Sequence, residues 1–259
     1  MLARLGRWAI ERARGTGYAL GFLAQVVRQT LLFFPRRRQV AFKVLVLQIL
    51  FTGVEAIGIV SLIALAIGAV IIVEGNTLLP RFGQSNLLYQ ILIVVITREL
   101  GPVLTAFVII ARSGTAIATE LGNMVVSHEI EAYVSVGIDP IAHLAVPRVL
   151  GVTIAMVALT VYFNFFGLVG SYLVSQLVQA TPLAEYFRNL LLTLQGRDVL
   201  SMLLKGTVFG LIVGVVATFQ GFKVKVAVTE IPRAAIKAVG QSFVLVFVAD
   251  AIITLITYV

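Results

Sequence analysis

Two charged residues, Arg98 and Glu99, stand next to each other in an otherwise apolar stretch from Leu87 to Ala111. A charge at the centre of a bilayer costs about 2.5 to 3.5 kcal/mol on insertion scales, so such residues usually face a polar cavity or a partner. Consecutive residues point about 100° apart on a helix, so these two side chains cannot neutralise each other well. We therefore predict that each has a partner elsewhere and that the pair marks the working centre.

The residues just after this pair interrupt the helix. Pro102 lacks the N–H that would bond the carbonyl of Arg98, so we expect a bend at this point. Broken helices that carry charge at membrane depth are tolerated where they line protein or a water-filled cavity. Transporters build substrate sites in this way, so the sequence from Arg98 to Pro102 is typical of a substrate site.

The composition indicates an integral membrane protein. Of the 259 residues, 59% are hydrophobic and 12% are charged, whereas a soluble domain has about 25% charged residues. The chain has no cysteine, which excludes disulfides, zinc–thiolate sites and cysteine nucleophiles. Its formal charge of +8 is explained by basic cytoplasmic loops, without any nucleic-acid partner.

Five stretches are long and apolar enough to cross a bilayer, which predicts an all-α fold of five transmembrane helices. They are about Val44 to Val73, Leu87 to Ala111, Val149 to Val178, Val199 to Gln220, and Ala238 to Val259. The first and third would be about 45 Å long as helices, so they must tilt or extend past the hydrocarbon.

The distribution of Arg and Lys predicts an amino terminus in the cytoplasm and a carboxyl terminus outside. Nine basic residues precede the first span, and four more lie between the fourth and fifth spans: Lys223, Lys225, Arg233 and Lys237. The alternating loops 74–86 and 179–198 carry only Arg81, Arg188 and Arg197.

We divide the chain into a basic amino-terminal segment, residues 1–43, and a five-span domain, residues 44–259. Within the first segment, Tyr18 to Phe34 mixes apolar and polar residues, which favours an amphipathic helix lying in the membrane interface. An ordinary basic anchor for the first span is the alternative.

The segment from Ser113 to Pro140 is a long polar interruption that is not basic. We predict a cytoplasmic helix over about 115–137, ended by Gly137 and Pro140. One of its faces would hold Glu120, Asn123, Ser127 and Glu131. An acidic face in this place suits docking onto a soluble partner, and a solvated connector is the alternative.

The fourth span holds Gly206, Gly210 and Gly214 at intervals of four residues. Small residues at this spacing let helix backbones approach closely. The pattern favours packing inside one subunit, and a dimer interface is the alternative.

An ordered series of motifs runs from about Thr97 to Leu150. They are Arg98-Glu99-Leu100-Gly101-Pro102, Ala111-Arg112-Ser113-Gly114, Glu120-Leu121-Gly122-Asn123-Met124, Gly137-Ile138-Asp139-Pro140 and Val146-Pro147-Arg148. The series closely resembles the MlaE (YrbE-like) permease family, and weaker likeness extends through both flanks. Members of that family are membrane subunits of ABC transporters that move phospholipids or other lipids with MCE-domain proteins.

The resemblance implies a subunit of the bacterial inner membrane that pairs with a second copy and binds a cytoplasmic ABC ATPase. It also implies a periplasmic MCE-domain partner and transport of phospholipid toward or from the outer membrane. The implied lipid-binding residues are Arg98, Glu99, Ile72, Leu78, Leu79 and Phe82. The residues implied to couple to the ATPase are Glu120, Leu121, Gly122, Met124, Glu131, Gly137, Asp139 and Pro140.

Of two polar residues in other spans, one matches the family pattern and the other differs from it. Asp250 matches an aspartate typical of the family, and a single buried acid bonded to a neighbouring helix is the alternative interpretation. Asn164 stands where many relatives would have an acid, and Val226 to Arg233 replaces a glycine-rich run. These differences concern subgroup and substrate more than the fold.

An enzyme and a secondary transporter are the two other classes of protein to consider for this sequence. The chain has no G-x-x-x-x-G-K-[ST] motif, so we expect ATP to be used by a partner, and no cofactor or catalytic residue here. His128 and His143 lack the H-E-x-x-H spacing of a metalloenzyme, so we predict no metal site. A secondary transporter with Arg98, Glu99 and Asp250 as an ion relay is the alternative, although no inverted repeat is visible.

Overall fold

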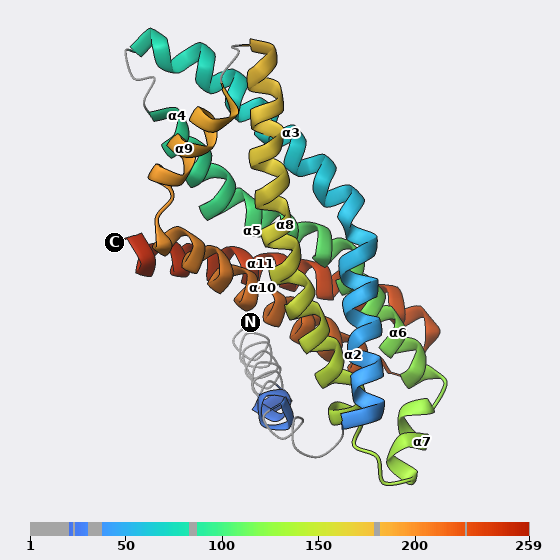
Figure 1. The fold of residues 1–259 in the computed structure, drawn as a ribbon. Helices are drawn as coiled ribbons and strands as arrows, with labels where there is room; N and C mark the ends of the chain where they lie inside the picture. The colour runs from blue at the N-terminus through green and yellow to red at the C-terminus, as the bar shows by residue number, and fades with distance from the viewer. Residues whose placement is uncertain are drawn as a thin grey trace, which may run out of the picture.

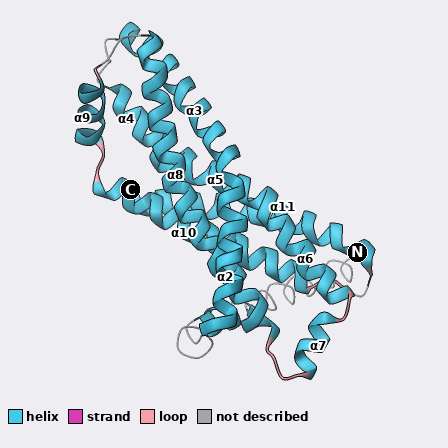
Figure 2. Cartoon of the chain, turned by 45° about the vertical axis from the view of Figure 1, so that its right-hand side comes forward, coloured by secondary structure: helices cyan, strands magenta, loops and turns pink. Residues whose placement is uncertain are grey.

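The computed structural model describes residues 21–22, 24–30, 38–82, 87–178, 182–225 and 227–258. All regular structure in these ranges is helical, and five helices are long and apolar enough to cross a membrane (Figure 1, Figure 2). They cover Phe42–Arg81, Leu88–Val126, Ile141–Leu177, Gly196–Phe222 and Val228–Tyr258. The prediction of an all-α membrane protein with five spans is confirmed.

Four of the five spans are built from joined helical pieces. The first contains α2 (Arg38–Gly53), η1 (Val54–Ala56), α3 (Ile57–Leu78) and η2 (Leu79–Phe82). The second contains α4 (Leu88–Leu92), η4 (Ile93–Leu100), α5 (Gly101–Ile109), η5 (Ile110–Gly114) and α6 (Thr115–Val126). The third contains η6 (Ile141–Ala145) and α8 (Val146–Val178), the fourth is α10 (Gly196–Phe222), and the fifth contains η7 (Val228–Glu230) and α11 (Ile231–Tyr258). Two shorter helices, α7 (Glu129–Ser135) and α9 (Leu183–Thr193), connect consecutive spans at opposite ends of the molecule (Figure 1).

The first and third spans extend well beyond the length that a bilayer needs. They are 40 and 37 residues long, or about 60 and 55 Å as helix, against a hydrocarbon core of about 30 Å. In Figure 1 the upper parts of α3 and α8, together with α9, project past the ends of α10 and α11. The expected extension is therefore present.

The second span is longer than predicted, because its helix continues to Val126 instead of ending at Ala111. Ile117, Ala118 and Leu121 of α6 are buried, and burying an apolar stripe of this kind stabilises the additional turns. The single helix predicted over 115–137 is instead two helices, α6 and α7, separated at His128, whose φ of 60° is left-handed.

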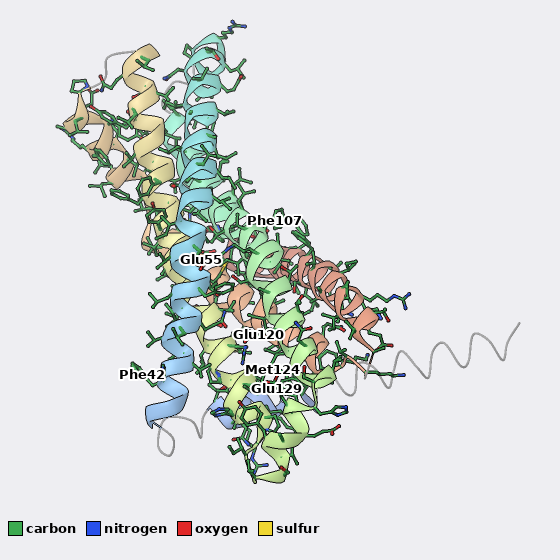
Figure 3. The ribbon with its side chains drawn as sticks, turned by 90° about the vertical axis from the view of Figure 1, so that its right-hand side faces the viewer. Phe42, Glu55, Phe107, Glu120, Met124 and Glu129 are labelled. Carbon is green, nitrogen blue, oxygen red and sulfur yellow. The ribbon has the colours of Figure 1, made fainter. Side chains whose placement is uncertain are left out.

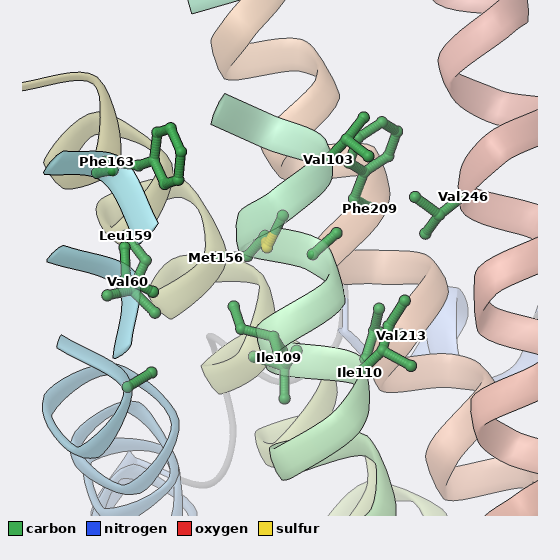
Figure 4. Close-up of a cluster of buried hydrophobic side chains, with 14 of the residues drawn as sticks. Val60, Val103, Ile109, Ile110, Met156, Leu159, Phe163, Phe209, Val213 and Val246 are labelled. Carbon is green, nitrogen blue, oxygen red and sulfur yellow. The ribbon is translucent and has the colours of Figure 1, made fainter. Parts of the chain in front are cut away.

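The core fixes the second, fourth and fifth spans against each other. Figure 4 shows Val103 and Ile110 of the second span beside Phe209 and Val213 of α10, with Val246 of α11 to their right. All five side chains are buried. These three spans carry the charged residues of interest, so their packing sets the geometry of the site.

The glycine stripe of α10, formed by Gly206, Gly210 and Gly214, packs against α8 of the same chain. A Cβ added at Gly210 would lie 2.6 Å from the Cα of Thr153, and one at Gly214 would lie 2.9 Å from the Cα of Val149. Real Cβ atoms do not approach backbone so closely, so these glycines are required for the α8–α10 contact. Packing inside one subunit, the interpretation favoured by the spacing, accounts for the stripe.

Part of the predicted interfacial helix lies among the described residues. Residues 24–30 are helical, and Val26 is buried against Ala145 and Val149 of the third span. Phe22 lies 5.6 Å from Phe219 of α10, measured between ring centroids. The remainder of residues 18–34, apart from 21–22 and 24–30, lies outside the described residues.

The two ends of the bundle differ in the segments that they expose. One end holds the beginning of α2, helix α7 and the α10–α11 connection, and the other holds η2, α9 and the end of α11 (Figure 1). This alternation agrees with a chain that crosses five times and has its basic connections at one end.

Candidate functional site

A π-helical turn immediately precedes the Gly101-Pro102 sequence. Ile93–Leu100 forms the π-helix η4, and the amide N–H of Gly101 donates to the carbonyl of Ile96, five residues earlier. A Cβ on Gly101 would lie 2.5 Å from that carbonyl oxygen, so this turn requires glycine. The irregularity predicted from Pro102 thus takes the form of a π-helix, a feature frequent at functional sites.

We expect Gly101→Ala to lower the stability of the protein by about 1 to 3 kcal/mol, because the added methyl must push the π-turn apart. Thermal unfolding in detergent measures this change. Gly240→Ala on α11 is the matched control, since nothing lies within 4 Å of the added Cβ there, and it should leave stability unchanged or slightly higher. Equal losses in the two variants would contradict a specific need for glycine at 101.

Lys205 of α10 lies between two carboxylates from different spans. Its Nζ is 2.8 Å from Oε2 of Glu99 and 2.7 Å from Oδ1 of Asp250, and its side chain is 0% exposed. The hydroxyl of Thr254 also donates to Glu99, at 3.2 Å. A buried lysine can remain charged only when paired in this way, so the three residues tie η4, α10 and α11 together.

Arg98 makes a third ion pair at this place. Its Nε lies 2.8 Å from Oδ1 of Asp198, whose side chain is fully buried. Asp198 also accepts a hydrogen bond from the backbone N–H of Gln195, in the capping box that begins α10. The guanidinium of Arg98 stacks on the ring of Tyr258, 4.4 Å from its centroid, and the hydroxyl of Tyr258 donates to Asp198.

The three ion pairs draw on one face of α10 and one face of α11. Asp198 and Lys205 are seven residues apart on α10, about two helical turns. Asp250, Thr254 and Tyr258 repeat every four residues on α11, which places them on one face. Two cations and three carboxylates therefore meet where the second, fourth and fifth spans touch. We call these five charged residues the charged centre.

The prediction that Arg98 and Glu99 each have a partner elsewhere is confirmed, and Asp250 joins them through Lys205. Lys205 and Asp198 were not among the predicted site residues. A lysine within the apolar fourth span was a visible signal for the first. Asp198 lies in the first turn of α10, whereas residues 179–198 were predicted to form a loop.

Asn164 supports the π-turn from the neighbouring span. Its Nδ2 donates to the carbonyl of Thr160 at 2.8 Å and contacts the sulfur of Met202 at 3.0 Å. The same nitrogen would lie 3.0 Å from a Cβ on Gly101. Asn164 is buried and packs on the second span at Gly101, next to the segment that carries Arg98 and Glu99.

The apolar residues implied to line a lipid site occupy different surroundings. Ile72 is buried in the core, whereas Leu78 is exposed and Leu79 is half-buried near the projecting end of α3. The side chain of Phe82 lies outside the described residues. Leu78 and Leu79 therefore present apolar surface, and Ile72 instead packs inside the bundle of this chain.

The residues implied to couple to an ATPase divide into packed and exposed groups. Leu121 is buried, and Gly122 lets α6 approach the α10–α11 connection, since its added Cβ would lie 3.1 Å from Val224.

Of the two acidic residues in this set, Glu120 is bound by Arg148 of α8, whose side chain is buried, at 2.6 Å. Glu131 is 77% exposed on α7, where it pairs with His128. Figure 3 shows Glu120, Met124 and Glu129 at this end of the molecule.

The turn between α7 and the third span is built by the last members of that set. Gly137 has a φ of 77°, which favours glycine, and it follows the end of α7. Asp139 accepts a hydrogen bond from the N–H of Ile141 and another from the side chain of Gln29, both at 2.9 Å. Pro140 directly precedes η6. Asp139 therefore connects this turn to the helical segment 24–30.

The chain is similar to proteins of one family over most of its length. The family model described as Permease MlaE matches residues 45–256. A probable ABC transporter permease protein of Rickettsia prowazekii is 31% identical over 207 residues, which are 80% of each chain. The intermembrane phospholipid transport system permease protein MlaE of Haemophilus influenzae is 27% identical over 258 residues, covering 99% of this chain and 97% of that one. The chloroplastic protein trigalactosyldiacylglycerol 1 of Arabidopsis thaliana is 29% identical over 78% of this chain and 58% of its own.

Proposed function

Because the chain belongs to the MlaE permease family of ABC transporters, we propose that it is the membrane subunit of an ATP-driven transporter of phospholipid or a related lipid. The lipid would move between the inner membrane and an MCE-domain protein, toward or from the outer membrane. The observation that carries this proposal is the charged centre, which is built into the junction of three apolar spans.

Arg98 is the proposed contact for a lipid phosphate. Its side chain is 20% exposed, and only its Nε pairs with Asp198. The two terminal nitrogens have no partner among the described residues, so they can donate charge-assisted hydrogen bonds to a phosphate. Stacking on Tyr258 fixes the plane of the guanidinium and so reduces the entropy lost when a head group binds.

The second proposed element is a switch around Lys205. This lysine bridges Glu99 and Asp250, which lie on different spans. When the spans shift relative to each other, one of these pairs can lengthen while the other is kept, so the buried Lys205 always retains one carboxylate partner. Such an element has two arrangements, and ATPase binding can favour one of them.

The proposed docking surface for the ATPase is helix α7 and the turn after it. Glu129 and Glu131 are exposed there, and Val134 and Val136 add exposed apolar surface. Glu120 is a structural anchor in this proposal, because Arg148 already holds it. Charged and apolar groups side by side on an exposed helix suit a specific protein partner.

The exposed surface of the spans and the charge of their connections support a proposal for the remaining partners and the orientation. In the most apolar windows of the first and last spans, only 28% and 17% of residues are buried, so we propose that a second copy covers part of this surface. The basic end, with α7, would face the cytoplasm. The amino terminus would then be cytoplasmic, the carboxyl terminus periplasmic, and the projecting end would meet the MCE-domain protein.

Purification from the native membrane tests the assembly. The tagged protein is isolated in mild detergent, and co-purifying proteins and lipids are identified by mass spectrometry. We expect an ATPase, an MCE-domain protein and enriched phospholipid. The same complex in liposomes should transfer fluorescent phospholipid only when ATP is supplied. Flux driven by an ion gradient without any ATPase would instead support the secondary transporter.

Reversing the charge of α7 tests the docking surface. We expect Glu129→Lys with Glu131→Lys to reduce ATPase binding about tenfold or more, because like charges would replace complementary ones at the contact. Pull-down of the ATPase by the tagged permease measures this. Glu74→Lys with Glu185→Lys is the matched control, since both residues are exposed at the opposite end, and it should not alter binding. Undiminished binding by the α7 variant would remove α7 from the docking surface.

A further inference from the structure

A basic cleft lies where the fourth and fifth spans meet, at the end opposite to the carboxyl terminus. It has a volume of about 240 Å³, many times what a single water molecule needs. Its lining comes from the end of α10, the connection after it and the first turns of α11: Gln220, Lys223, Val224, Lys225, Glu230, Arg233, Ala234 and Lys237. The charged centre contributes none of these residues.

The cations of this cleft are not neutralised by the protein. Four basic side chains line it and only one carboxylate, that of Glu230. Glu230 accepts a hydrogen bond from the backbone N–H of Lys225 at 2.9 Å, so part of its capacity is used to shape the loop. No carboxylate of a described residue forms an ion pair with any of the four cations. With four cations and one carboxylate the lining has a net charge of +3, which makes the cleft complementary to an anion.

A hydrogen bond joins the two helices that form the wall of the cleft. The Nε2 of Gln220 donates to Oε1 of Gln241 at 2.6 Å, which fixes α10 to α11 beside the basic residues. Val224 and Ala234 are buried beneath them. Arg233, Lys237 and Gln241 repeat every four residues on α11, so they share one face. The basic side chains therefore project from two helices that are joined at this point.

Apolar surface next to the cleft identifies the kind of anion. Ile236 is 72% exposed between Arg233 and Lys237, and further along α11 Val244 and Phe247 are also exposed. This surface belongs to a helix apolar enough to span the membrane. An anion carried by two acyl chains could place its head group in the cleft and its chains along α11, whereas a free anion would make no use of that surface.

We propose that this cleft binds the head group of an anionic phospholipid from the adjacent leaflet, as a site separate from the transport pathway. Clusters of Lys and Arg next to the end of a span are the usual recognition element for such lipids. The proposal does not depend on the direction of transport or on the identity of the transported lipid, because it concerns a lipid held at the rim of the protein.

The test uses the complex purified from membrane and placed in nanodiscs of phosphatidylcholine with 20 mol% phosphatidylglycerol. A photoactivatable phosphatidylglycerol is compared with the same probe on phosphatidylcholine, and labelled peptides are mapped by mass spectrometry. We expect the anionic probe to label residues 223–247 preferentially. Each basic side chain near the surface contributes about a fivefold factor to binding, so Lys225→Gln with Arg233→Gln should weaken this labelling about 30-fold at low salt.

The matched control is Arg81→Gln with Arg188→Gln, which removes two exposed positive charges at the other end and should leave the labelling intact. Equal labelling by the two probes would overturn the proposal. Protection of the cleft lysines from chemical modification by 5 mM inorganic phosphate, without preferential labelling by the anionic probe, would show that the cleft binds free phosphate and not a lipid. Labelling that appears only after the ATPase is stripped away would show that the cleft is a protein contact, which also overturns the proposal.

Discussion

Replacing Lys205 with methionine is expected to abolish lipid transfer and to destabilise the protein by about 3 to 5 kcal/mol, the usual effect of removing one partner from a buried ion pair. Methionine has a similar length but no charge, so Glu99 and Asp250 would face each other without a cation between them. Thermal unfolding in detergent measures stability, and ATP-driven transfer of fluorescent phospholipid measures function. Lys43→Met, which changes an exposed lysine of α2, should alter neither.

A triple variant separates the two effects of Lys205. Glu99→Gln, Lys205→Met and Asp250→Leu together remove all three charges, and replacing a buried ion cluster by neutral residues of similar size is often neutral or stabilising. We expect this variant to unfold at nearly the wild-type temperature and still to transfer no lipid. Recovery of transfer together with stability would show that the three residues only hold the spans together.

The spans could be predicted from the sequence because apolar runs of 20 or more residues leave few other folds open. Their exact ends could not. The second span continues past Arg112 because Ile117 and Leu121 pack into the core, and that burial depends on helices far away in the sequence. The break at His128 was also hard to predict, since a left-handed φ is uncommon at any residue other than glycine, even at histidine, where it is enriched.

The charged centre was predictable in kind but not in detail. Arg98 and Glu99 could not satisfy each other on a helix, so partners were required, and the structure supplies them. The identity of those partners depends on the packing of α10, whose Lys205 is 106 residues from Glu99 in the sequence. Glu120 gives the opposite case: its place on an acidic face suggested a free docking residue, but Arg148 of the next span holds it.

Replacing Arg98 with alanine is expected to lower lipid transfer about 10- to 100-fold while leaving the assembly intact. The loss corresponds to about 1.5 to 3 kcal/mol, the contribution of a hydrogen bond to a charged group. The cost to stability should be smaller than for Lys205, because Asp198 keeps its bonds from Gln195 and Tyr258. It also stays in the first turn of α10, where the helix dipole favours a negative charge.

Two further variants decide what Arg98 does. Arg98→Lys keeps the positive charge but loses the planar guanidinium with its paired donors and its stacking on Tyr258. If Arg98 binds a phosphate, this variant is expected to keep part of the lipid-transfer activity. Arg197→Ala is the control, because its guanidinium also lies near the ring of Tyr258, at 5.7 Å, but forms no ion pair with Asp198. Transfer should be unchanged in that control. If Arg98→Ala transfers lipid at the wild-type rate in the same liposomes, the phosphate contact must be assigned to another residue. The proposed role of Glu99, Lys205 and Asp250 as the part of the centre that responds to the ATPase would not be affected.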